Sequence, residues 1–114
     1  PTGHALDYAV YFNPWFTATA TSTIHTPLED ALLALIDGAS STVDVALYGL
    51  DRQSVVDALI AAHNQGVTVR VVGDDEAASG EYSAGYQALT AAGITVITDT
   101  SGYIQHNNST FAAL

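Results

Sequence analysis

The residues best suited to chemistry lie near the C-terminal end of the sequence. His106 ends an extended segment, residues 103–106, and is followed by Asn107 and Asn108. An imidazole in this position can act as a nucleophile or as a general acid or base. Because side chains alternate along a strand, Asn108 would lie on the same face as His106. The spacing alone leaves a turn and a reactive site equally open.

The remaining histidines, His4, His25 and His63, are better explained as surface or structural residues. His4 lies near the N-terminus and His25 precedes a helix cap. His63 lies near the end of a predicted helix, where the helix dipole favours a cation.

An acidic run at Asp74, Asp75 and Glu76 could hold a hard cation such as Mg²⁺. Acidic residues that follow a strand are more typical of a solvated turn or a helix cap. The glycine-rich phosphate loops GxGxxG and GxxxxGK[ST] are both missing from the sequence. We therefore expect no cofactor and no metal ion, and we rank a metal-binding domain last among the alternatives.

The elements that would position these residues centre on a strand–helix–strand unit. Residues 43–48 and 67–72 are β-branched and apolar, which predicts two strands. The residues between them place one apolar stripe on a helix: Val55, Val56, Leu59, Ile60 and Ala62. Asp51 is predicted to cap this helix, and Gly66 to end it. A connection of this length predicts parallel strands with a right-handed crossover.

Similar signals flank the central unit. Residues 5–12 read as a first strand, and Thr26, Pro27 and Glu29 form a capping box that starts a helix ending at Gly38. Its predicted buried stripe is Leu28, Ala31, Leu32, Leu35 and Ile36.

After the second central strand we expect a loop through Gly80. A third helix, closed by Gly93, is predicted from Tyr82, Tyr86, Leu89 and Ala92, and residues 94–98 form another strand. The order β-α-β-α-β-α-β-β predicts a layered α/β fold with a mostly parallel sheet, in one domain over residues 1–114. Ligands of such sheets bind beyond the carboxyl ends of the strands.

The composition restricts the partners and the compartment. Twelve carboxylates against two arginines and no lysine give a net charge of −10, which disfavours nucleic acid as a partner. The absence of cysteine excludes disulfides and leaves the compartment open. No apolar run is long enough for a transmembrane segment, and the sequence starts at Pro1 without methionine. We expect a soluble protein, secreted or periplasmic after N-terminal processing, or an excised fragment.

The sequence resembles the phospholipase D superfamily in its bacterial, single-motif, nuclease-like form. The resemblance covers nearly the whole chain, and its segments occur in the family's order and spacing: residues 10–14 (VYFNP), 28–39, 43–50 (VDVALYGL), 55–62, 66–74 (GVTVRVVGD), 93–98 and 104–107. It implies a phospholipase D-like fold and hydrolysis or transfer at a phosphodiester.

The family signature H-x-K-x4-D falls on His106, Asn108 and Ala113, and only the histidine matches. The resemblance implies that His106 is the catalytic nucleophile, which forms a phosphohistidine, and that Asn108 binds the substrate at the lysine position. A second copy of the motif, from another repeat or subunit, would protonate the leaving group, so a homodimer is one expected arrangement. Without the lysine, electrostatic stabilisation is lost, and we expect little or no activity.

The segment 109–114 is not expected to form the hydrophobic strand that follows the motif in the family. A truncated piece, a rearranged end and a degenerate member each explain this, and we expect a domain that is incomplete at its C-terminus. The alternative function is a non-catalytic binding or assembly module on the same scaffold. The substrate could be a lipid, a nucleic acid or a small phosphodiester.

Overall fold

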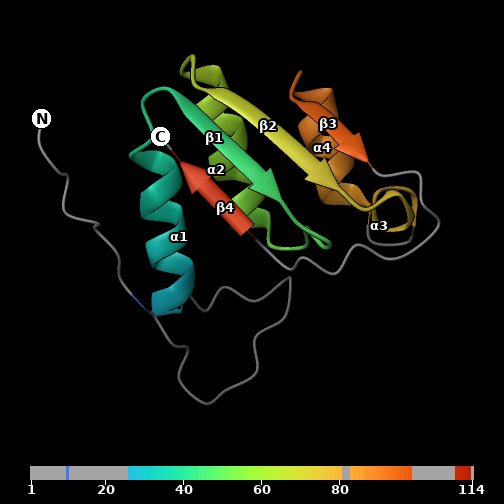
Figure 1. Cartoon of the computed structure of the whole chain (residues 1–114), viewed down its shortest axis with the longest axis horizontal. Helices are drawn as coiled ribbons and strands as arrows, with labels where there is room; N and C mark the ends of the chain where they lie inside the picture. The colour runs from blue at the N-terminus through green and yellow to red at the C-terminus, as the bar shows by residue number, and fades with distance from the viewer. Residues whose placement is uncertain (1–9, 11–25, 81–82, 99–109, 114) are drawn as a thin grey trace, which may run out of the picture.

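The computed structural model describes residues 10, 26–80, 83–98 and 110–113 (Figure 1). In chain order the elements are α1 (Pro27–Asp37), β1 (Thr42–Ala46), α2 (Gln53–Asn64), β2 (Thr68–Gly73), α3 (Asp75–Ser79), α4 (Ala84–Ala91), β3 (Thr95–Thr98) and β4 (Thr110–Ala113). Of the first predicted strand only Val10 is described, and the predicted extended segment 103–106 lies outside the described residues.

The strands form one sheet in the order β3-β2-β1-β4. β1 pairs with β2 in parallel, and β2 pairs with β3 in parallel. β4 runs antiparallel to β1. The predicted α/β fold with a mostly parallel sheet is therefore confirmed.

The strand β4 corrects one expectation. Residues 110–113 do form a strand, with Thr110 opposite Ala46 and Ala113 opposite Val43. The segment contains two alanines, which have little preference for strands. The edge of β1 offers unpaired N–H and C=O groups, and pairing with them outweighs the weak local preference.

The helices pack against one face of the sheet. Val43 and Val45 of β1 are buried, as are Val69 and Val71 of β2, and they share one core with side chains of α1, α2 and α4. Figure 1 shows α2 and α4 behind the strands. The alternate residues of β2 point the other way and are exposed. One face of the sheet thus carries the core, as period-two alternation requires.

The central helix α2 agrees with the prediction except at its start. Val55, Val56, Leu59 and Ala62 are buried, and Gly66 ends the helix with a φ of 94°. The predicted cap at Asp51 is wrong, because Arg52 occupies the N-cap position and its carbonyl accepts hydrogen bonds from the amides of residues 55 and 56. No side chain caps this helix.

Helix α1 begins as predicted, with the Thr26 hydroxyl accepting a hydrogen bond from the amide of Glu29 at 3.1 Å. Its predicted buried stripe is partly wrong, because Leu28 and Leu35 are 46% and 48% exposed. Ile36 is fully buried, and Leu32 and Leu33 pack against the core. The helix packs beside α2 and buries only one narrow side. The spacing of apolar residues in the sequence does not show how wide the buried side of a helix is.

Between β2 and α4 the expected loop contains the short helix α3. Asp74 caps it, and its Oδ1 accepts a hydrogen bond from the amide of Ala77 at 2.9 Å. The helix-cap interpretation of the acidic run is thus confirmed for Asp74. Helix α4 starts at Ala84, and Gly93 follows it with a φ of 92°, as predicted for a helix-ending glycine.

Candidate functional site

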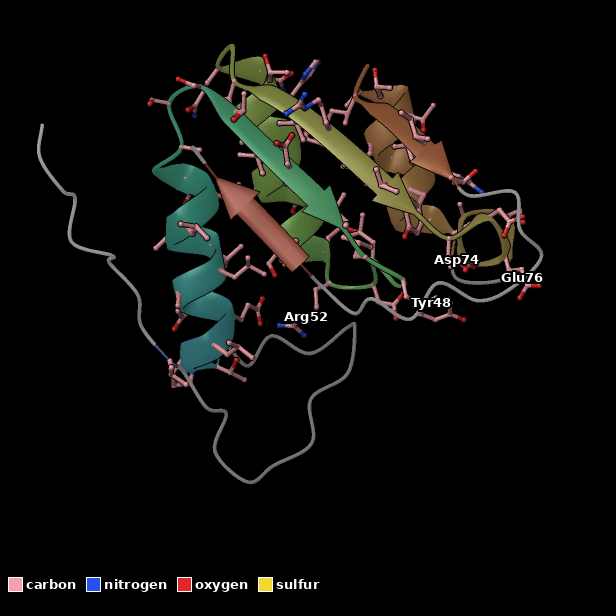
Figure 2. All side chains as sticks on the ribbon, viewed as in Figure 1. Tyr48, Arg52, Asp74 and Glu76 are labelled. Carbon is pink, nitrogen blue, oxygen red and sulfur yellow. The ribbon has the colours of Figure 1, made fainter. Side chains whose placement is uncertain are left out.

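The carboxyl ends of β1 and β2 meet at one edge of the sheet. Figure 2 shows Tyr48 and Arg52, which follow β1, along the same edge as Asp74 and Glu76, which follow β2. The antiparallel strand β4 begins at this edge, because Thr110 lies opposite the last residue of β1. Three chain segments therefore meet where parallel α/β sheets bind their ligands.

The predicted site residues are only partly placed. His106 and Asn108 lie outside the described residues, as do His4 and His25. Ala113 lies in β4 opposite Val43, the second residue of β1. His63 is in the last turn of α2, where it is half-buried.

The segment that follows β1 is held by Tyr86 of α4. The Tyr86 hydroxyl lies 3.1 Å from the carbonyl oxygen of Leu47 and 2.7 Å from that of Tyr48 and donates to them. Tyr86 is buried, and burial raises its pKa to about 12 because the charged phenolate is poorly solvated there. A neutral hydroxyl thus fixes the backbone of the turn that leads to Arg52.

Two glycines allow this close packing. A Cβ at Gly73 would lie 2.5 Å from the ring of Tyr86, and a Cβ at Gly85 would lie 2.1 Å from the carbonyl oxygen of Leu50. Any side chain at either position would push α4 away from the edge of the sheet. The position of the segment after β1 therefore depends on both glycines.

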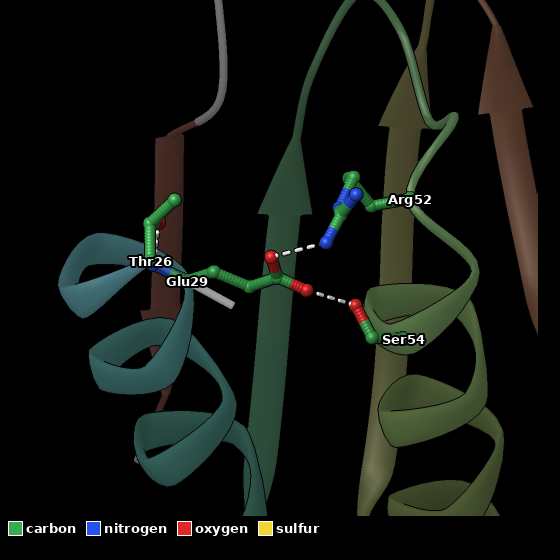
Figure 3. A network of polar contacts seen from close by, with 4 residues as sticks. All are labelled: Thr26, Glu29, Arg52 and Ser54. Atoms are coloured by element: carbon green, nitrogen blue, oxygen red, sulfur yellow. Dashed lines mark hydrogen bonds and ion pairs between the residues drawn. The ribbon is translucent and has the colours of Figure 1, made fainter. Parts of the chain in front are cut away.

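A polar network links α1 to the start of α2 (Figure 3). Nη2 of Arg52 lies 2.5 Å from Oε2 of Glu29, and the hydroxyl of Ser54 donates to Oε1 of the same carboxylate. The side chains of Arg52 and Glu29 are 25% and 10% exposed. The guanidinium is thus held by a nearly buried carboxylate, and a quarter of the Arg52 side chain is exposed.

The described acidic residues at this edge are not arranged as a shared cation site would require. Asp74 is fully buried and caps α3. Among the residues that the structure describes, no three His, Cys, Asp or Glu side chains lie close enough to share a metal ion. The magnesium alternative, which used Asp74, Asp75 and Glu76, is therefore not supported.

The other arginine lies away from this edge. Arg70, in the middle of β2, forms two hydrogen bonds of 2.6 Å to the carboxylate of Asp44, its cross-strand neighbour. These bonds lower the pKa of Asp44 and raise that of Arg70. Both side chains lie on the face of the sheet opposite the core.

Comparison with known proteins identifies the family. A family model described as "Cardiolipin synthase, PLD-like domain" matches residues 32–111, which is most of the chain. The chain belongs to the phospholipase D superfamily. The resemblance inferred from the sequence is confirmed, and the matched range contains both His106 and Asn108.

A solved structure supports the same assignment. The crystal structure of Nuc from Salmonella typhimurium, a phospholipase D family member, is 31% identical, with a TM-score of 0.62. The match covers 68% of this chain and 51% of Nuc, so this phospholipase D-like chain spans about half the length of that relative. No curated protein matches the chain.

Within the described part of the chain, no helix is both long enough and apolar enough to cross a bilayer. A secreted or periplasmic location stays a prediction.

Three residues that shape the site were not recognised as site residues from the sequence. From the sequence alone, Glu29 is explained as half of a capping box, and Tyr86 as one of the residues that predict the third helix. The available signal for Arg52 is its rarity, since it is one of two arginines in a chain without lysine and lies in the turn between the first central strand and the central helix.

Proposed function

We propose that this chain carries phosphodiesterase chemistry at the carboxyl edge of its sheet, with His106 as the nucleophile and Asn108 at the position of the family's lysine. Family membership over residues 32–111 is the observation that carries the proposal. β4 supports it, because it begins at that edge four residues after His106. Four residues span at most about 14 Å, which is compatible with a site beside Tyr48 and Arg52.

In the proposed reaction a nitrogen of His106 attacks phosphorus, and the bond from phosphorus to the leaving oxygen breaks. Water then cleaves the phosphohistidine and regenerates the histidine. The leaving oxygen needs a proton, and we propose that His106 of the partner subunit in a homodimer provides it. Sedimentation velocity of the purified chain tests the dimer.

The proposed site is weak as it stands. Asn108 can donate a hydrogen bond to a phosphate oxygen but carries no charge. Loss of one electrostatic donor slows comparable reactions by about 10²- to 10³-fold. We therefore expect turnover close to background for the unmodified chain.

Hydrolysis of bis(p-nitrophenyl) phosphate by four proteins tests the proposal: the unmodified chain, His106→Ala, Asn108→Lys, and the double variant with both changes. We expect Asn108→Lys to release p-nitrophenol measurably, and the double variant to lose this activity. Thermal melts verify that all four are folded. A folded Asn108→Lys protein without His106-dependent release would overturn the phosphodiesterase proposal. His106-dependent turnover at ordinary rates in the unmodified chain would overturn the proposed weakness.

The alternative is a non-catalytic binding or assembly module on the same scaffold. It is favoured by the signature itself, since Asn108 and Ala113 replace the lysine and aspartate. Inactivity of all four proteins, together with one defined oligomer in solution, would support this alternative.

The substrate type is left open among lipids, nucleic acids and small phosphodiesters. The net charge of −10 makes a polyanionic substrate the least favourable of the three.

A further inference from the structure

We propose that Arg52 binds the phosphate group of the phosphodiester at the carboxyl edge of the sheet. This inference rests on the proposed function, because it names the phosphate-binding residue of that same site. Four observations carry it: the number of cations in the chain, their positions, the contacts of Arg52, and the chemistry of its guanidinium.

The chain has few groups that could attract a phosphate. Its sequence contains two arginines, Arg52 and Arg70, and no lysine, against twelve carboxylates. A phosphodiester carries a negative charge, and proteins usually bind phosphate oxygens through charge-assisted hydrogen bonds from cations. Apart from protonated histidines, the two arginines are the cationic side chains that a phosphodiester site in this chain could use.

Only one of the two arginines lies at the candidate site. Arg70 lies in the middle of β2, where its guanidinium donates two hydrogen bonds to the carboxylate of Asp44 on the exposed face of the sheet. Arg52 follows β1 and lies along the same carboxyl edge as Tyr48 (Figure 2). β4 begins at the same edge, opposite Ala46.

The contacts of Arg52 hold its guanidinium in one orientation. Oε2 of Glu29 accepts from Nη2 of Arg52, and Oε1 of Glu29 accepts from the hydroxyl of Ser54 (Figure 3). With both oxygens engaged and only 10% of its side chain exposed, the carboxylate is a fixed anchor. Glu29 is thus a positioning residue for Arg52.

A guanidinium can bind a carboxylate and a phosphate at the same time. It presents five N–H donors in a planar fork that matches the geometry of phosphate oxygens, which a lysine ammonium does not. The side chain of Arg52 is 25% exposed, so an anion can approach it from solvent. Because Glu29 neutralises part of the charge, we expect moderate affinity.

The two arginines make a direct test possible by nitrogen-15 NMR. The unmodified chain should give two Arg Nε–Hε signals, and the signal missing from Arg70→Gln identifies Arg70. Dimethyl phosphate, a phosphodiester without a hydrolysable aryl group, is titrated into the protein at constant ionic strength. We expect a saturable shift of the Arg52 signal and no saturable shift of the Arg70 signal.

Matched variants provide the second measurement. Arg52→Gln and Arg70→Gln remove the same charge, so any general effect of net charge is equal in both. We expect Arg52→Gln to weaken dimethyl phosphate binding about tenfold or more, as judged from backbone amide shifts, and Arg70→Gln to change it less than about twofold. Thermal melts verify the fold of Arg52→Gln, and the titration of the unmodified chain remains decisive if that variant is unfolded.

Several results would overturn the inference. They are an unchanged Arg52 signal, equal shifts of both arginine signals, and the same Arg52 shift when sodium chloride replaces dimethyl phosphate. The NMR titration requires no turnover, so it is independent of the hydrolysis test. Binding at Arg52, together with no His106-dependent hydrolysis by the folded Asn108→Lys protein, would leave the inference standing and remove the proposed function. His106-dependent hydrolysis that Arg52→Gln does not reduce would keep the proposed function and overturn the inference about Arg52.

Discussion

The Tyr86 hydroxyl holds the backbone between β1 and Arg52 through the carbonyl groups of Leu47 and Tyr48. Replacing it in Tyr86→Phe leaves the ring packed against Gly73 but removes the donor. We expect a loss of about 1–3 kcal/mol in the free energy of unfolding, because buried carbonyl groups lose their hydrogen bond. Urea denaturation at pH 7 measures the change.

The same residue gives the protein a dependence on alkaline pH. Burial raises the pKa of Tyr86 to about 12 in the folded chain, above an ordinary value of 10.0. The unfolded chain therefore loses this proton first, and the stability contribution that is complete below pH 10 disappears as the pH rises to 12. In Tyr86→Phe this part of the pH dependence should be absent. Parallel stability curves for both proteins between pH 10 and pH 12 would contradict the assignment.

At the scale of elements, the contact between α4 and the segment after β1 requires a glycine at position 85. A Cβ there would lie 2.1 Å from the carbonyl oxygen of Leu50. Backbone atoms cannot move aside as a flexible side chain can, so we expect Gly85→Ala to destabilise the protein by about 1–3 kcal/mol. Differential scanning calorimetry would record this as a lower melting temperature.

Gly49→Ala is the matched control for Gly85→Ala. A Cβ at Gly49 would meet nothing within 4 Å, although this glycine lies in the same segment, next to Leu50. Its substitution should leave stability unchanged or raise it by about 0.4–1 kcal/mol through the lower entropy of the unfolded chain. If both variants lowered the melting temperature equally, the contact at Gly85 would not be the cause.

The sequence predicted most elements because their signals are local. The β-branched and apolar character of residues 43–48 and 67–72, the apolar stripe of α2 and the ending at Gly66 each follow from neighbouring residues. β4 was missed because its stability comes from pairing with β1, which is distant in sequence. The exposure of Leu28 and Leu35 was missed because it depends on where α1 packs.

The site was harder to predict for the same reason. The carboxyl edge of the sheet follows from strand order, and Asp74 at that edge could be named in advance. The contact between Glu29 and Arg52 joins residues 23 positions apart, and no local pattern indicates such a pair. Glu29 also lies in the first turn of α1, where a carboxylate is favourable. This local role explains the residue from the sequence without any long-range partner.

At the scale of the whole molecule, twelve carboxylates and two arginines set a net charge of −10. Repulsion among like charges destabilises a compact state, and salt screens it. We expect the melting temperature to rise between about 0.01 M and about 1 M sodium chloride, over which the screening length falls from about 30 Å to about 3 Å. A melting temperature that falls over this range would show that the ion pairs outweigh the repulsion.

Substituting two aspartates of α1 in turn distinguishes the repulsion among all charges from the local effect of the helix dipole. Asp37 is the last residue of α1, where the helix dipole disfavours a carboxylate, and Asp30 lies in the first turn, where the dipole favours one. Asp37→Asn and Asp30→Asn change the net charge equally. If the dipole adds to the repulsion, Asp37→Asn should stabilise the protein by about 0.3–1 kcal/mol more than Asp30→Asn at low salt. That difference should shrink at high salt, because screening weakens both effects. Equal stabilisation by the two variants at every salt concentration would mean that net charge alone governs the response.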